Sequence, residues 1–155
     1  LLFSGYKATV DWPSARFWRE ITDFYKEAKV IHTVRPVDDW LRSIQRTIFP
    51  VIQNWMNCET EDERQRGQMA WNLIGEQTFK KRIHDQAYVR SVFEAHTGQV
   101  IELVRPDHLL VFNVMEGWDP LCKFLDFEIP DQPFPNTNTT AEFIARRESI
   151  NLSSG

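Results

Sequence analysis

The 155-residue chain lacks a surplus of basic residues, since 18 lysines and arginines face 22 aspartates and glutamates. The formal net charge of −4 and the isoelectric point near 5.6 remove any general attraction for nucleic acid or anionic lipid. An anionic ligand would therefore need a local binding site. We expect no nucleic-acid partner.

Cysteine and paired histidines are also scarce. The two cysteines, Cys58 and Cys122, match neither a zinc-ligand spacing nor a disulfide framework, which fits a reducing compartment. The four histidines form no H-x-x-x-H or H-E-x-x-H pair. We therefore predict no metal and a cytoplasmic protein.

Long apolar runs are absent too. No stretch approaches the roughly 20 apolar residues of a membrane-spanning helix, and the first residues lack the basic-then-apolar order of a signal peptide. The sequence opens without methionine, so an upstream targeting segment would not be visible. The composition, 42% hydrophobic and 26% charged, is typical of one globular domain. We expect this domain to span residues 1–150, with 151–155 as a disordered or artificial tail.

Three segments share one arrangement, in which a short apolar strand, a turn and an amphipathic helix follow one another. The strands are expected to end at Val10, Val34 and Val114. This repetition favours parallel strands joined by helical crossovers, and the runs "KVIHTV" and "LLVFNV" lack the polar alternation of a half-exposed strand. The predicted fold class is α/β, a parallel sheet flanked by helices.

A long helical region separates the second and third units. It opens with Thr60 and Glu63 at the spacing of a capping box, and its periodicity directs Met69 and Leu73 toward a core. A further helix is predicted from about Gln86 to His96, ended by Gly98.

The last part of the chain is predicted to be irregular after Leu125. Three prolines in "DFEIPDQPFPNTN" forbid regular structure there. The stretch "TAEFIARRESI" then predicts a terminal helix.

A ligand of an open parallel sheet binds beyond the carboxyl ends of the strands. Asp11 follows the first predicted strand, Arg35 the second and Glu116 the third. Arg35 has two interpretations, an ion pair with Asp38, Asp39 or Asp11, and a fork of N–H donors that holds a phosphate. Composition alone favours the ion pair.

Ser43 lies eight residues after Arg35, on the second turn of the following helix, where its hydroxyl can face the strand end. This pattern resembles the motif with which sulfotransferases hold the 3'-phosphate of PAPS, the sulfuryl donor, and "TVRPVDDWLRS" carries it here. The chain is also similar to a sulfotransferase-like P-loop family in "VDWPSARFWREI", "AKVIHTVR", "LLVFNVMEGWDPLCKFL" and "PDQPFP". The similarity runs from about Tyr6 to Asn136.

The resemblance implies a P-loop NTPase-like fold and transfer of a sulfuryl group from PAPS to a hydroxyl or amine of a small-molecule acceptor. It also implies that Arg35 and Ser43 bind the 3'-phosphate. Asp11 stands where cytosolic sulfotransferases have a histidine general base, so it is a candidate base. The alternative for Asp11 is an N-cap carboxylate for a helix begun at Pro13.

Two features depart from the family pattern. The glycine-rich 5'-phosphosulfate loop has no counterpart, because none of the six glycines forms G-x-x-x-x-G; the domain is therefore expected to lack its first βα unit. Pro36 also stands where relatives have an acidic residue, which restricts Arg35 to extended backbone.

Two other functions stay open. One is a non-catalytic nucleotide-binding or scaffold module that keeps the fold. The other is a small-molecule kinase, which is less favoured because no Walker lysine is present. An incomplete sheet would also leave an edge for pairing with a second copy, so a homo-oligomer is open as well.

Overall fold

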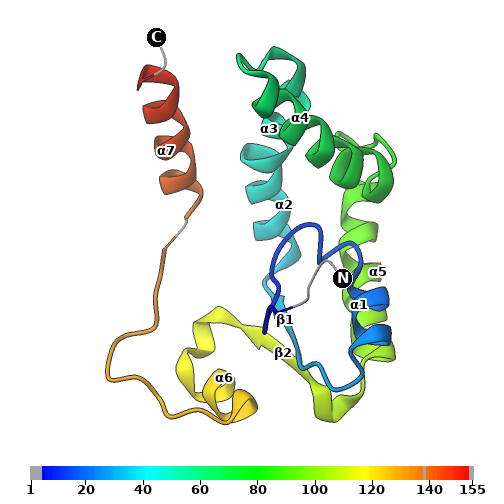
Figure 1. Cartoon of the computed structure of the whole chain (residues 1–155), viewed down its shortest axis with the longest axis vertical. Helices are drawn as coiled ribbons and strands as arrows, with labels where there is room; N and C mark the ends of the chain where they lie inside the picture. The colour runs from blue at the N-terminus through cyan, green and yellow to red at the C-terminus, as the bar shows by residue number, and fades with distance from the viewer. Residues whose placement is uncertain (1–4, 138, 154–155) are drawn as a thin grey trace.

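A computed structural model describes residues 5–137 and 139–153 of the chain (Figure 1). In chain order its elements are α1 (Trp18–Phe24), β1 (Val30–Val34), α2 (Val37–Arg46), α3 (Ile48–Gln53), the 3₁₀ turn η1 (Asn54–Asn57), α4 (Glu61–Ala70), the π-helix η2 (Trp71–Thr78), α5 (Gln86–Leu103), the 3₁₀ turn η3 (Pro106–His108), β2 (Leu109–Asn113), the 3₁₀ turn η4 (Val114–Glu116), α6 (Trp118–Leu125) and α7 (Thr140–Ser153).

The sheet consists of β1 and β2, which pair in parallel. Helix α5 covers one face, where His32 on β1 shares a hydrogen bond of 3.1 Å with Thr97. The other face meets α6 and the segment after it, because the ring of Phe112 on β2 lies 6.0 Å from that of Phe134. Successive strand residues point to opposite faces. The predicted α/β fold, a parallel sheet flanked by helices, is confirmed.

The second and third predicted βα units are both present. After β1 the chain turns at Pro36, and α2 begins at the next residue. After β2 it turns through Gly117, whose φ of 73° lies in the left-handed region that glycine adopts without steric cost. The second turn brings α6 into contact with β2, whereas α2 packs chiefly against α3 and α5.

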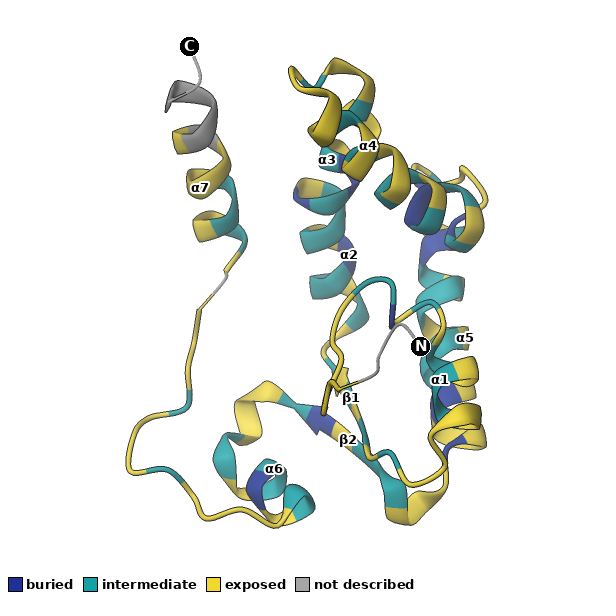
Figure 2. Cartoon of the chain, in the orientation of Figure 1, coloured by how far each residue is buried: buried dark blue, intermediate teal, exposed yellow. Residues whose placement is uncertain are grey.

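The main hydrophobic core lies where α2, α3, η2 and α5 meet, and the buried positions in Figure 2 concentrate there. Aromatic rings pack against one another in this core, where the ring centroid of Phe79 lies 5.2 Å from that of Phe49 and 6.4 Å from that of Trp40. The buried members are Leu41, Phe49, Ile52, Ile74, Phe79, Ile83 and Val89.

The first predicted strand is wrong for the residues described. Residues 5–10 form no strand, and every one of them is exposed, with Val10 at 87%. A strand persists only where a neighbouring strand pairs its backbone groups, and this segment runs over the surface without one. The helix predicted from Pro13 also begins later, at Trp18, because residues 12–16 form turns.

The capping box of α4 is confirmed. The backbone N–H of Glu63 donates to the Thr60 hydroxyl over 3.2 Å, and the Glu63 carboxylate accepts from the Thr60 N–H over 3.1 Å. Leu73 packs on the core as predicted, but Met69 is 56% exposed and its predicted core position is wrong. The chain passes from α4 into the π-helix η2, whose wider turn changes which residues share a face.

Gly98 does not end a helix. Helix α5 continues through it to Leu103, and Val100 beyond it is only 2% exposed. Burying a valine is worth more than the cost of about 1 kcal/mol that glycine imposes inside a helix. The predicted helix end at Gly98 is therefore wrong, because the burial of Val100 outweighs the cost of glycine inside the helix.

The irregular segment after α6 is confirmed, and we call residues 126–137 the strap. Figure 1 shows the strap leading away from α6 to α7, which lies on the side of α2 opposite α5. Helix α7 confirms the predicted terminal helix and continues to Ser153. Residues 154 and 155 of the predicted tail lie outside the described residues. Within the described part of the chain, no helix is both long and apolar enough to cross a bilayer.

Candidate functional site

The carboxyl ends of β1 and β2 lie at the same edge of the sheet, because Val34 pairs with Asn113. Arg35 leaves this edge directly after β1. Glu116, which follows β2, is already engaged, since its carboxylate accepts a hydrogen bond of 2.8 Å from the Asn113 N–H. Glu116 therefore closes its own turn, so of these two charged residues Arg35 is the one whose side chain can contact a ligand.

Arg35 is exposed, and among the described residues it has no carboxylate partner. The acidic residues that follow it bind other arginines: Asp38 pairs with Arg90 on α5, and Asp39 pairs with Arg42 one turn along α2. The ion-pair interpretation of Arg35 is therefore wrong for the neighbouring acids. Its guanidinium keeps all of its donors available to a ligand.

Ser43 is half-buried on α2 and faces away from α5. Asp38 and Gln45 occupy the flank of α2 that contacts α5. The Ser43 hydroxyl instead lies 3.3 Å from the hydroxyl of Thr140, the first residue of α7. Sequence reasoning missed Thr140, because the pair is 97 residues apart and no local pattern marks it.

Asp11 lies in a turn and is exposed. Its Oδ1 accepts a hydrogen bond of 2.8 Å from the Trp12 N–H, and its φ of 62° is left-handed. The N-cap interpretation is wrong, because no helix begins at Pro13. The turn is closed by the Ala15 N–H, which donates to the Asp11 carbonyl over 2.9 Å, and the role of the carboxylate as a base stays a prediction.

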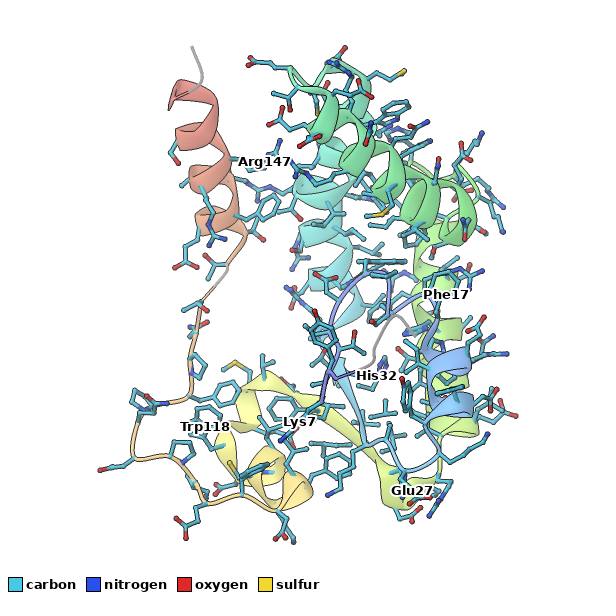
Figure 3. All side chains as sticks on the ribbon, in the orientation of Figure 1. Lys7, Phe17, Glu27, His32, Trp118 and Arg147 are labelled. Atoms are coloured by element: carbon cyan, nitrogen blue, oxygen red, sulfur yellow. The ribbon has the colours of Figure 1, made fainter. Side chains whose placement is uncertain are left out.

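Two histidines that are far apart in the sequence lie together on the face of the sheet that α5 covers. The rings of His32, labelled in Figure 3, and His96 have centroids 5.4 Å apart. The ring of Trp18 on α1 lies 6.0 Å from that of His96. Burial lowers the pKa of both histidines, and for His96 the charges of His32 and Arg19 lower the pKa further. The neutral His32–His96 pair, with Trp18 packed against it, connects β1, α5 and α1. Within the described residues, no three potential ligands cluster to hold a metal.

A parallel βα layout with an unpaired arginine at a strand end defines an α/β domain with a candidate anion site. The family described as sulfotransferase domain matches residues 1–143. The chain belongs to this family, and the resemblance noted in its sequence is confirmed. It is also similar to Ava biosynthesis cluster protein M of Aspergillus versicolor, with 33% identity over 150 residues. That alignment covers 90% of this chain and 56% of the relative, so the chain spans little more than half of the relative's length.

Proposed function

We propose that the protein transfers the sulfuryl group of PAPS to a hydroxyl or amine of a small-molecule acceptor. The observation that carries this proposal is the state of Arg35, an exposed guanidinium beyond β1 whose acidic neighbours are paired elsewhere. A guanidinium offers parallel N–H donors to a phosphate and keeps its charge at any relevant pH. In this family the corresponding ligand is the 3'-phosphate of PAPS.

Ser43 is the second proposed contact with the 3'-phosphate. Its hydroxyl has one proton to donate and two lone pairs that accept. Either hydroxyl can be the donor in the contact between Ser43 and Thr140, and when Thr140 donates, Ser43 can still donate its proton to a phosphate oxygen. Arg35 then supplies charge and Ser43 supplies a neutral donor.

Asp11 is the proposed general base. The acceptor oxygen or nitrogen attacks sulfur, its bond to sulfur forms, and the bond from sulfur to the bridging oxygen breaks. PAP leaves with that electron pair, and the acceptor proton passes to the Asp11 carboxylate. Such a reaction depends on positioning and on stabilising charge at the bridging oxygen.

The complete fold is proposed to be P-loop NTPase-like, with residues 1–150 as part of one domain. A two-stranded sheet is marginal in water, which supports additional strands beside β1 or β2. The 5'-phosphosulfate loop has no sequence counterpart among these 155 residues. Another part of the protein is proposed to supply that loop.

A second candidate function is a non-catalytic module that binds the nucleotide or serves as a scaffold. The exposure of Asp11 favours it. It would bind PAP without catalysing turnover, so the two candidates differ in a direct activity measurement.

The test is calorimetric titration of the full-length protein with PAP. Replacing Arg35→Ala should weaken binding by about 1.5 to 3 kcal/mol, the worth of a charged hydrogen bond. The matched control is Arg46→Ala, which replaces an exposed arginine at the end of α2 and should bind as wild type does. Equal affinity of the Arg35 variant and wild type would contradict the proposed phosphate site.

A further inference from the structure

The contact between Ser43 and Thr140 joins the proposed phosphate site to the far end of the chain. The two hydroxyl oxygens are 3.3 Å apart, and both side chains are half-buried. Serine inside a helix often donates instead to the carbonyl one turn earlier. Ser43 has no such bond within the described structure, and Thr140 is its side-chain hydrogen-bonding partner there.

The strap that leads to Thr140 is attached to the sheet. The indole N–H of Trp118, at the start of α6, donates to the carbonyl of Gln132 over 2.9 Å. The ring of Phe134 lies 4.7 Å from that of Trp118, which Figure 3 labels, and 6.0 Å from that of Phe112 on β2. These contacts hold Gln132 and Phe134 of the strap against α6 and β2.

The start of α7 is also determined by hydrogen bonds. The Thr139 hydroxyl accepts from the Glu142 N–H over 3.3 Å, and the Glu142 carboxylate accepts from the Thr139 N–H over 2.7 Å. Hydrogen bonds from Thr60 lower the pKa of Glu63 on α4, and the charge of Arg147, farther along α7, makes a smaller contribution in the same direction. Thr139 therefore caps the helix, and the next hydroxyl, that of Thr140, is left to contact Ser43.

We propose that Thr140 is a positioning residue for the phosphate contact of Ser43. This inference rests on the proposed function of the site. Thr140 donates its proton to Ser43 Oγ, which leaves the single proton of Ser43 to point at the phosphate. At 3.3 Å the contact is longer than the usual 2.7–2.8 Å between hydroxyls. It strengthens when Ser43 donates to an anion, because hydrogen bonds in a chain polarise one another.

The test is a double-mutant cycle, with PAP affinity of the full-length protein measured by calorimetry. Thr140→Val should weaken binding about three- to tenfold, the worth of one neutral hydrogen bond. The same substitution in a Ser43→Ala background should have no further effect, because its partner is gone. Thr140→Ser keeps the hydroxyl and should restore wild-type affinity. Thr137→Val, an exposed position on the strap, is the matched control and should change nothing.

The outcomes separate two failures. If Arg35→Ala and Ser43→Ala both leave PAP affinity unchanged, the proposed function and this inference fall together. If Ser43→Ala weakens binding while Thr140→Val does not, the inference alone is overturned. It is also overturned if Thr140→Val weakens binding equally in both backgrounds, which would mean that the substitution only disturbs the docking of α7.

Discussion

His32 on β1 and His96 on α5 face each other across the sheet–helix interface, with ring centroids 5.4 Å apart. His32 shares a hydrogen bond of 3.1 Å with Thr97, and Trp18 packs edge-on against His96 at 6.0 Å. Burial lowers the pKa of both rings below the ordinary value of 6.5. The folded protein therefore holds both histidines in the neutral form more strongly than the unfolded chain does.

We predict that the folded protein loses stability on mild acidification. When pH falls below 6.5, the unfolded chain takes up protons on these histidines before the folded protein does, which favours unfolding. The stability that these neutral histidines contribute is fully present above pH 6.5. It is lost as the pH falls through their lowered pKa values in the folded protein. The measurement is the free energy of unfolding in urea between pH 8 and 5, with His96→Gln expected to flatten the decline.

The matched control for this prediction is His84→Gln. His84 is exposed and shares a hydrogen bond of 2.9 Å with Gln53, away from the His32–His96 pair. Its substitution should leave the pH dependence of unfolding in place. An equally steep decline in the His96 variant would show that other groups cause the acid sensitivity.

The core prediction concerns Phe79, which is 3% exposed and packs between Phe49 and Trp40. Phe79→Ala removes a ring that its neighbours cannot replace, so a cavity remains. The free energy of unfolding should fall by about 3–5 kcal/mol. Met115→Ala removes an exposed side chain, 86% accessible, and should change stability by less than about 0.5 kcal/mol. A similar loss for both variants would argue against the described core.

Two glycines inside helical segments should respond in opposite directions to alanine. A Cβ on Gly75 would lie 2.5 Å from the ring of Trp71, and that ring is held by a hydrogen bond of 3.2 Å to Glu76. Gly75→Ala should therefore destabilise the fold by about 1–3 kcal/mol. A Cβ on Gly98 meets nothing within 4 Å, so Gly98→Ala should stabilise α5 by about 0.5–1 kcal/mol. Chemical denaturation of both variants measures whether each substitution raises or lowers the free energy of unfolding.

The parts of the fold that could be predicted are those with local signals. The turn at Pro36, the capping box of Thr60 and Glu63, and the prolines of the strap all act over a few residues, and the structure confirms them. The strand predicted to end at Val10 needed a neighbouring strand, which no local pattern reports. The helix end predicted at Gly98 is wrong because packing with residues distant in the sequence keeps α5 helical beyond that glycine.

The candidate site divides in the same way. Arg35 and Ser43 could be predicted as phosphate contacts because a strand and the next helix carry them at a fixed spacing, and their role stays a prediction. Which acids pair with which arginines was not predictable, since Asp38 binds Arg90 on another helix, 52 residues away. Thr140 was missed for the same reason, because only the path of the strap brings it to Ser43.

The last prediction tests Asp11 as the general base. Asp11→Asn keeps an oxygen that can accept from the Trp12 N–H, and asparagine tolerates the left-handed backbone at φ 62°, so the turn should persist. The amide cannot accept the acceptor's proton, so the rate of PAP release from PAPS, with an accepted substrate, should fall about 10²- to 10⁴-fold. PAP affinity should not change. Asp126→Asn, at an exposed left-handed position with φ 61°, is the matched control and should turn over normally. A near-normal rate for the Asp11 variant would mean that the carboxylate is not the base and only accepts the hydrogen bond from Trp12 within the turn.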